Sequence, residues 1–379
     1  MKSKRLMIIF LLSVPSLIII GILFMQQKAF GQQPKEERLQ KILLSPNYKD
    51  GKFQNMEETP VMSEEGMTYK FLFEMFKRHK NTKPSLPIPS VKVDLKQLVG
   101  GSTDIVWFGH SSYLIRTNKT NILVDPIFSK KASPVSFAGV SSFEGSLPYA
   151  AADMPDIDIM VITHDHYDHM DYKTIMALKD RVKFFVCPLG AGQHLDKWGI
   201  AKSKIIELDW WEGKEIVPGI MLTATPARHF SGRGLVRNKT LWASFVLKTD
   251  ILQIFIGGDS GYGKHFKAIG EKFGAFDIAM LECGQYNKFW PYIHSMPEET
   301  ALAAKDLNTK VLMPVHWGKF KLAMHPWYEP VMRVGAKAAE LHIPIVTPVI
   351  GKPFILENIV NEPLWVNELL KNDNNVTLN

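Results

Sequence analysis

From about Thr103 onward, the chain is a series of short apolar runs separated by turns. These runs are rich in β-branched and aromatic residues, a composition that predicts β-strands. Helical patterns occur between them, after Asp171, around 296–307 and around 329–341. Strands that alternate with helices predict an α/β domain. The strands that we expect are 105–108, 113–116, 121–125, 157–162, 184–186, 205–208, 221–224, 244–247, 253–256 and 311–315.

The N-terminus has a different pattern. Lys2, Lys4 and Arg5 precede an uncharged apolar run over residues 6–25. A helix of twenty residues spans about 30 Å, the thickness of the hydrocarbon core of a bilayer. The upstream positive charges favour an uncleaved membrane anchor that leaves the catalytic domain outside the cytoplasm. The alternative is a signal peptide cleaved after Gly31, which would give a secreted or periplasmic protein.

These patterns divide the chain into four parts. Residues 1–31 form the transmembrane anchor or signal segment. Residues 32–100 form a polar extension, with a helix over 69–76 and a proline-rich linker. Residues 101–355 form the α/β domain, and residues 356–379 form a C-terminal tail.

The composition is that of an ordinary globular protein. Of the 379 residues, 46% are hydrophobic and 22% are charged, so the chain can bury a substantial core. The net charge of +7 is mildly basic, but no clustered basic and aromatic residues indicate nucleic-acid binding. We therefore expect no nucleic-acid partner. Cys187 and Cys283 lie within apolar runs and are expected to be buried free thiols.

The densest group of polar residues follows the apolar run 157–162. Directly after it, three histidines and two aspartates occur within six residues. Imidazole and carboxylate are ligands that suit zinc and other first-row divalent ions, which predicts a metal site. His164 and His166 alternate, so both can point to one side of an extended strand. Asp168 and His169 come a turn later and can reach a second ion.

Three more candidate ligands, His229, Asp259 and His316, each stand at the end of an apolar run. A two-metal hydrolase holds its ions about 3.5–4 Å apart and needs more ligands than the first cluster supplies. We expect Asp259 to bridge the ions, because a carboxylate has two oxygens. Gly257 and Gly258 permit close backbone approach there. One ion would be held by His164, His166 and His229, and the other by Asp168, His169 and His316.

This pattern of ligands at strand ends resembles the metallo-β-lactamase superfamily, whose fold is an αββα four-layer sandwich. From about residue 107 to 318, further motifs are similar to the N-acylphosphatidylethanolamine-hydrolysing phospholipase D family. The resemblance implies two Zn²⁺ ions, or another first-row divalent metal, and a phospholipid substrate cleaved to N-acylethanolamine and phosphatidic acid. The motifs are Leu-Val-Asp-Pro-Ile-Phe-Ser at 123–129, Gly-Asp-Ser-Gly-Tyr at 258–262, Leu-Glu-Cys-Gly at 281–284, Pro-Glu-Glu at 297–299 and Val-His-Trp-Gly at 315–318.

The resemblance also implies roles for single residues. Tyr167 and His294 would contact the phospholipid head group. From the chemistry of the side chains rather than from the resemblance, we expect Asp259 to position the nucleophile, with Asp168 as a metal ligand, and His294 to donate a proton to the leaving alkoxide. Asp125 matches an aspartate near the metals of the family, while a plain role as a turn former at the end of a strand stays equally open.

Two other functions fit the same residues. In one alternative the site is the same but the substrate is a lactone or a soluble phosphodiester instead of a phospholipid, and a panel of substrates distinguishes the two. A membrane-tethered binding protein that has lost turnover is the third reading, against which the complete set of ligands argues. The sequence leaves the oligomeric state open, and a homodimer is compatible with it.

Overall fold

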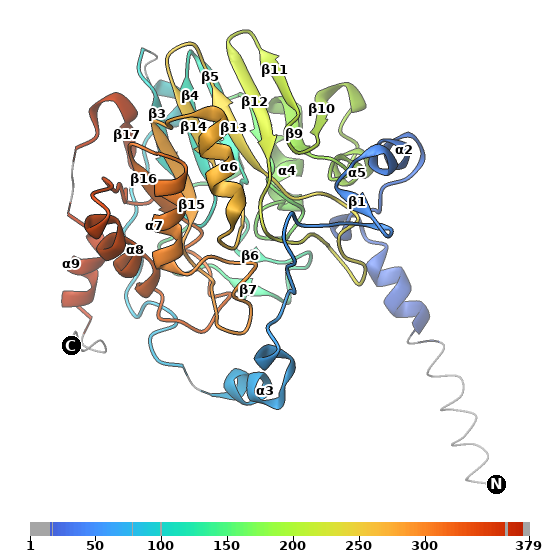
Figure 1. The fold of residues 1–379 in the computed structure, drawn as a ribbon, viewed down its shortest axis with the longest axis horizontal. Coiled ribbons are helices and arrows are strands. Elements are labelled where there is room, and N and C mark those ends of the chain that lie inside the picture. Colours follow the sequence, from blue (N-terminus) through green and yellow to red (C-terminus); the bar gives the residue numbers. More distant parts are fainter. Residues whose placement is uncertain (1–15, 17, 78, 99–100, 361–362, 374–379) are drawn as a thin grey trace.

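The body of the molecule is a sandwich of two β-sheets with helices on both outer faces (Figure 1). The computed structural model describes residues 16, 18–77, 79–98, 101–360 and 363–373. One sheet has seven strands and the other has six. The predicted α/β class, with its αββα layers, is confirmed.

The strands lie in the following spatial order. The seven-stranded sheet runs β10 (Ile205–Leu208), β9 (Val182–Pro188), β8 (Ile157–Val161), β5 (Thr120–Val124), β4 (Tyr113–Thr117), β3 (Asp104–Trp107) and β17 (Pro353–Ile355). The six-stranded sheet runs β11 (Gly213–Val217), β12 (Ile220–Thr225), β13 (Ser244–Lys248), β14 (Gln253–Ile256), β15 (Ile278–Glu282) and β16 (Leu312–Val315). Two small hairpins are β1 (Tyr48–Lys49) with β2 (Lys52–Phe53), and β6 (Lys131–Ala132) with β7 (Val140–Ser141).

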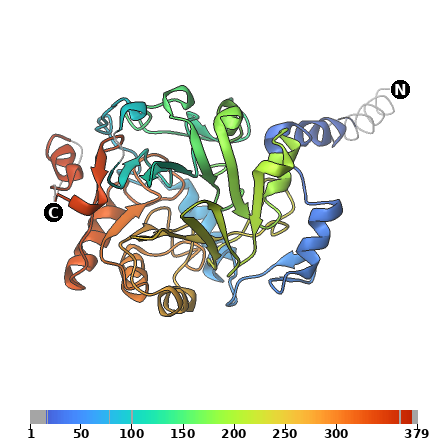
Figure 2. The same ribbon diagram turned by 90° about the horizontal axis from the view of Figure 1, so that it is seen from above.

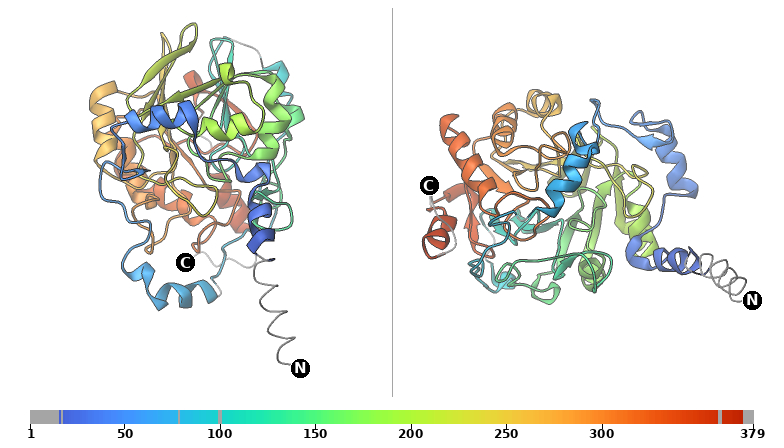
Figure 3. Two further views of the ribbon diagram at one scale, coloured as in Figure 1. Left: turned by 90° about the vertical axis from the view of Figure 1, so that its right-hand side faces the viewer. Right: turned by 90° about the horizontal axis from the view of Figure 1, so that it is seen from below.

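Helices cover both sheets. The seven-stranded sheet is covered by α4 (Tyr172–Leu178) and α5 (Gly192–Lys197), and the six-stranded sheet by α6 (Lys264–Phe273), α7 (Pro297–Asp306) and α8 (Glu329–Glu340). The helices α2 (Glu36–Leu44) and α9 (Trp365–Lys371) lie at opposite ends of the molecule (Figures 1 and 2). Helix α3 (Tyr69–Phe76) lies apart from the sheets (Figure 3).

Alternation along the strands of the seven-stranded sheet fills two cores. In β5, Ile122 and Val124 face the other sheet and join the large core between the sheets, whereas Leu123 points to the opposite side. There it packs in a second core with Ile175 of α4 and Trp198, which follows α5. Because successive side chains of a strand point to opposite faces, a strand that is apolar at every position is buried on both sides.

The register of the sheets brings several strand ends to one edge. Strand β8 is parallel to β5, while β3 and β5 are each antiparallel to β4, so β3, β5 and β8 share a direction. In the other sheet, β14, β15 and β16 are parallel to one another. Strand β13 is antiparallel to both β12 and β14, so β12 has the same direction as these three strands. The carboxyl ends of parallel strands meet at one edge, which is where ligand sites form in α/β sheets.

Most of the predicted elements are confirmed within one or two residues. The sequence reading missed α6, whose buried side chains include Phe266 and Ile269. Gly270 interrupts the helical pattern in the sequence, although the helix itself continues through it. A Cβ atom at this position would lie 2.1 Å from the carbonyl oxygen of Asp306. The glycine therefore serves the close packing of α6 on α7 and does not end the helix. Cys187 and Cys283 are buried free thiols, as expected.

The predicted localisation, a membrane-anchored protein with its catalytic domain outside the cytoplasm, is corrected. Within the described residues, no helix has both the length and the apolar character needed to cross a bilayer. Residues 1–15 and 17 of the predicted anchor lie outside the described residues. At the end of this segment, the short helix η1 (Lys28–Phe30) contacts the sandwich, where the indole nitrogen of Trp198 donates to the carbonyl oxygen of Lys28 at 2.7 Å.

Segments on both sides of the predicted domain boundaries contact the sandwich. Arg38 of α2 forms an ion pair with Glu207 of β10, at 2.5 Å between Nε and Oε2. Trp365 of α9 stacks on Trp317, with 5.3 Å between the ring centroids. The division at residues 31, 100 and 355 stays a prediction.

Candidate metal centre

The histidine-rich segment forms a loop and not the end of a strand. Strand β8 ends at Val161, and the amides of His169 and Met170 both turn back to the carbonyl oxygen of His166, at 3.2 and 2.8 Å. Contrary to the sequence prediction, His164 and His166 therefore do not alternate along a strand, because β8 ends before both of them and the turn begins at His166. The turn brings the side chains together by a different route.

The first group of candidate ligands combines both sheets. The ligand atoms of His164, His166, His229 and Asp259 lie within 4.8 Å of one another. His166 Nδ1 lies 2.9 Å from His164 Nε2 and 3.2 Å from His229 Nε2. Asp259 Oδ2 lies 3.8 Å from Nε2 of both His164 and His229. Three nitrogens and one carboxylate oxygen around a common centre are a donor set that suits zinc.

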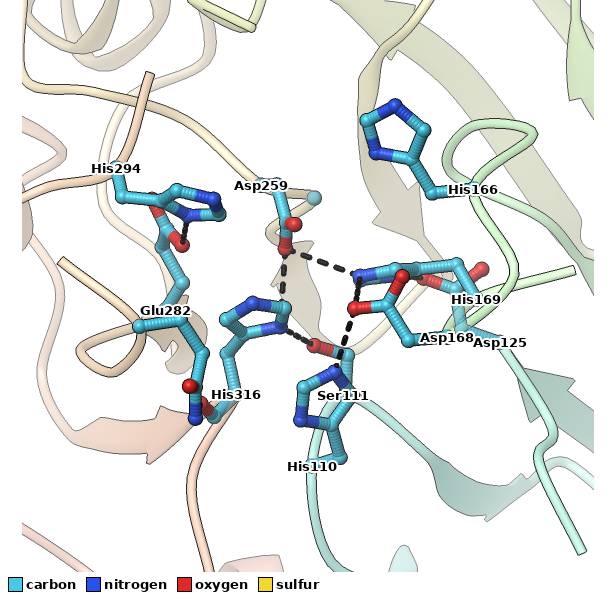
Figure 4. A network of polar contacts seen from close by, with 12 residues as sticks. His110, Ser111, Asp125, His166, Asp168, His169, Asp259, Glu282, His294 and His316 are labelled. Carbon is cyan, nitrogen blue, oxygen red and sulfur yellow. Dashed lines mark hydrogen bonds and ion pairs between the residues drawn. The ribbon is translucent and has the colours of Figure 1, made fainter. Parts of the chain in front are cut away.

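The second group contains one residue that the sequence reading missed. The ligand atoms of His110, Asp168, His169 and His316 also lie within 4.8 Å of one another (Figure 4). Asp168 Oδ2 lies 2.9 Å from His110 Nε2 and 3.5 Å from His169 Nε2. Asp259 Oδ1 lies 3.2 Å from His169 Nε2 and 3.1 Å from His316 Nδ1. Asp259 thus has one oxygen towards each group.

Several buried polar atoms at this point lack a hydrogen-bond partner within the described part of the chain. They are Nε2 of His169, Nε2 of His316, Oδ1 of Asp259 and Nδ1 of His110. Leaving buried polar groups unpaired costs about 1–3 kcal/mol each. Their concentration in one place, together with the donor types, fits a site built for metal ions.

Burial and charge set the protonation of these groups. Burial, with help from the neighbouring imidazoles, lowers the pKa of His164 well below its usual value, so the ring is neutral and able to bind a metal. Burial alone would raise the pKa of Asp259, but His169 and His316 hold it well below the usual range. Asp168 is likewise ionised, through His169 and His110. Burial alone would lower the pKa of His169, but the carboxylates of Asp259, Asp168 and Asp125 raise it well above its usual value. The cluster therefore offers charged carboxylates next to the neutral ring of His164.

Hydrogen bonds behind the ligands fix their orientation. Asp125, at the end of β5, accepts from His169 Nδ1 at 2.8 Å and from the amide of Thr163 at 2.8 Å. His229 Nδ1 contacts the carbonyl oxygen of Ile293 at 2.8 Å. Such partners determine which ring nitrogen faces the metal. Of the two roles open for Asp125, the structure thus supports the one near the metals.

Three residues of the centre have backbone torsions that side chains rarely adopt. The φ angles are 56° at His110, 38° at Asp125 and 65° at His316. All three stand just after a strand at the shared edge of a sheet, and turning there aims each side chain inward. Strained torsions of this kind cluster at functional sites, because the surrounding structure must hold them.

A cavity of about 180 Å³ opens over the centre. His294 lines it and lies beside Glu282, with 2.6 Å between His294 Nδ1 and Glu282 Oε2. Burial alone would lower the pKa of His294, but the carboxylate of Glu282 raises it to about 9. The other residues that line the cavity are His166, Asp168, His229, Phe230, Asp259, Gln285, Trp290, Ile293, His316 and Leu322.

Two residues of the loop, Tyr167 and Asp165, point away from the cavity. The hydroxyl of Tyr167 donates to the carbonyl oxygen of Arg233, and its ring lies 4.3 Å from the guanidinium of Arg233. Tyr167 is not among the residues that line the cavity, so its predicted contact with a head group lacks support in this geometry. The carboxylate of Asp165 faces the interior, where it contacts His194 Nε2 at 3.1 Å and accepts from Thr240 at 2.8 Å.

The sequence reading missed His110 and Glu282 as members of the site. His110 follows β3 by three residues, the same pattern of apolar strand and polar residue that indicated the other ligands. Glu282 is the last residue of β15 and was noted only as part of a motif. Nothing in the sequence shows that its side chain turns towards His294, because eleven loop residues separate the two along the chain.

Comparison with known proteins agrees with the architecture. Residues 120–317 match the family described as the β-lactamase superfamily domain. The chain belongs to this superfamily. It is 39% identical to an uncharacterised protein of Mycobacterium tuberculosis over 81% of this chain and 84% of that protein. It is 32% identical to N-acyl-phosphatidylethanolamine-hydrolyzing phospholipase D 1 of Caenorhabditis elegans, over 59% of this chain and 65% of that protein.

Among solved structures, a metallo hydrolase from the archaeon Ignicoccus hospitalis superposes with a TM-score of 0.51 at 20% identity, over 67% of this chain and 98% of that one. This similarity shows the fold. By its family match and its sequence relatives, the protein is a metal-dependent hydrolase of the metallo-β-lactamase superfamily.

Proposed function

We propose that the protein is a dinuclear zinc phosphodiesterase that hydrolyses N-acylphosphatidylethanolamine-like phospholipids to N-acylethanolamine and phosphatidic acid. One observation carries the proposal: the two oxygens of Asp259 face two separate groups of ligands. A shared carboxylate between two sets of nitrogen and oxygen donors fits a pair of ions that act together on one phosphoryl group.

The surroundings of the cavity favour a lipid. A groove of about 450 Å³ adjoins it, and Phe230, Trp290 and Ile293 line both. The groove is otherwise lined mainly by apolar side chains, among them Met62 and Phe71. An acyl chain laid along it would remove apolar surface from water at about 25 cal/mol per Å², with the phosphodiester over the candidate metal centre.

Each residue would have a defined part in the reaction. When bound, the ions would supply a nucleophile from water at neutral pH and offset the charge on the phosphoryl oxygens. Asp259 would orient the attacking water, since its carboxylate stands between the ligand groups. His294 would give a proton to the oxygen that leaves as the alcohol, because it lines the cavity and the carboxylate of Glu282 beside it favours the protonated ring.

Metal analysis and turnover of the zinc-loaded protein test this proposal. We expect two ions per chain and hydrolysis of N-acylphosphatidylethanolamine. Asp168→Ala and His316→Ala should each lower turnover by orders of magnitude and lower the metal content to about one ion. Near-wild-type activity of these variants with one ion would falsify the dinuclear scheme. Fast hydrolysis of a soluble diester with none of the phospholipid would overturn the choice of substrate.

A further inference from the structure

Glu282 is buried at the carboxyl end of β15, where its two oxygens have different partners. Its side chain is only 4% exposed. Oε1 accepts from the amides of Ser260 and Ser295, at 2.9 and 3.0 Å. Oε2 is left for His294 Nδ1, at 2.6 Å. The two amide bonds hold the carboxylate in place, so Oε2 is presented to the ring in one fixed direction.

His294 stands between this carboxylate and the candidate metal centre. Figure 4 shows its ring between Glu282 and Asp259. The ring also lies 5.1 Å from that of His229 and is stacked on that of His316 at 5.3 Å. With Nδ1 bound to Glu282, Nε2 is the ring nitrogen that remains for a substrate in the cavity. A carboxylate that accepts from Nδ1 fixes the orientation of a histidine and stabilises its doubly protonated form, in which Nε2 carries a proton as well.

We propose that Glu282 is a positioning residue that makes His294 an effective proton donor to the leaving oxygen of the diester; this inference rests on the proposed phosphodiesterase function. A bond forms between phosphorus and the oxygen of water, whose proton passes to solvent. The bond from phosphorus to the leaving oxygen breaks, its electron pair stays on that oxygen, and the Nε2 proton of His294 neutralises it. A proton from solvent then restores His294.

This role predicts a dependence on the leaving group. An alkoxide such as that of N-acylethanolamine is a poor leaving group and needs the proton, whereas p-nitrophenolate leaves readily without one. General acid catalysis contributes about 10²–10⁴-fold where it is needed. The expected signature of Glu282 is therefore a large effect on an alkyl diester and a small effect on an aryl diester of the same lipid.

The sharpest variant is Glu282→Gln. Its amide oxygen can still accept from Ser260 and Ser295, while its NH₂ group would face His294 Nδ1 and move the ring proton to Nε2 in the neutral form. The zinc-loaded enzyme is assayed on N-acylphosphatidylethanolamine and on phosphatidyl-p-nitrophenol. We expect kcat/KM to fall by about 10²-fold on the first and by less than about threefold on the second, with unchanged metal content.

Glu329→Gln is the matched control. Glu329 is a partly buried carboxylate that contacts Tyr286 and Arg333 and does not line the cavity. This variant should leave both substrates unaffected. Equal losses on both substrates in Glu282→Gln, or no loss on either, would overturn the role of Glu282.

A second readout does not depend on turnover. In ¹⁵N-histidine-labelled, zinc-loaded protein, the signals of His294 are assigned by their loss in His294→Asn. We expect a protonated Nδ1 in the wild type and a change of tautomer or charge in Glu282→Gln. An unprotonated Nδ1 in the wild type would overturn the inference. If the wild type hydrolyses neither diester but shows the expected Nδ1 signal, the proposed substrate class fails while the arrangement of Glu282 and His294 stands.

Discussion

The two walls of the cavity are built in different ways. One wall is the loop after β8, in which His164, His166, Asp168 and His169 come from six consecutive residues. The other wall belongs to the six-stranded sheet and gives one ligand after each of three strands. On the loop wall, the buried carboxylate of Asp125 orients the ligand His169 and also accepts from the backbone amide of Thr163. On the sheet wall, each ligand is held by its own strand.

The difference indicates how each wall should respond to substitution. A change behind the loop is transmitted to several ligands at once, because they share a short piece of backbone. A change behind the sheet wall should reach one ligand and leave its neighbours in place. Asp259 is the exception, because its two oxygens face both groups of ligands.

The largest effect is expected for Asp259→Ala. Removing the carboxylate takes a donor from both ligand groups, so both proposed ions should bind more weakly and turnover should fall by about 10³-fold or more, equivalent to about 4 kcal/mol. Metal analysis after gel filtration and the hydrolysis rate measure this. Asp306→Ala, which removes a carboxylate bonded to Tyr262 outside the cavity, is the control. If Asp259→Ala retains two ions, the proposal that Asp259 is a ligand shared by both metal sites is contradicted.

Asp125→Asn is expected to have the next largest effect. Asp125 binds both His169 and Thr163, so its loss should disturb the loop wall and lower metal affinity by about 10–100-fold. The matched change on the other wall is Ser111→Ala, which removes the hydroxyl at 3.0 Å from His316 Nδ1 and should cost only a few-fold. Competition with a chelator measures both. Equal losses in the two variants would contradict the difference between the walls.

Within the loop, Asp165→Asn separates stability from metal binding. Asp165 points away from the cavity and accepts from Thr240 and from the amide of Gly232, at 2.8 and 2.7 Å. Weakening these charge-assisted bonds should lower the free energy of unfolding by about 2 kcal/mol and the Tm by several degrees, without loss of metal. Thermal unfolding and metal analysis of the same sample test it. Loss of an ion at unchanged Tm would place Asp165 among the ligands.

The smallest effect is expected for His265, which contacts Ser260, the residue next to Asp259 in the chain. Burial lowers the pKa of His265 to about 3, and its Nε2 lies 3.0 Å from the hydroxyl of Ser260. Between pH 6.5 and 5.5 the unfolded chain takes up this proton and the folded chain does not, so stability falls as the pH falls, by about 1 kcal/mol. His265→Gln should remove that part of the pH dependence. Urea unfolding at both pH values measures it, and an identical slope in the variant would contradict the assignment.

Local patterns predicted much of the fold. Apolar runs gave most strands within two residues, because each run is buried on one or both faces whatever its neighbours are. They also located the metal centre, because every predicted ligand follows such a run. The N-terminal segment shows the limit of the same reasoning, since apolar character alone predicted an anchor that the described part of the structure does not contain.

By itself, the sequence determined the α/β class, the cluster of ligands that follows β8 and the chemistry that those ligands favour. Only the tertiary structure decided which residues surround them. His110 and Glu282 stand at strand ends like the predicted ligands, but whether such a residue faces the cavity depends on the direction of its strand, the turn that follows and the position of the opposite sheet. Those are properties of packing between segments far apart in the chain. For the same reason, Asp165 and Asp168, three residues apart, point in opposite directions, one into the protein and one into the cavity.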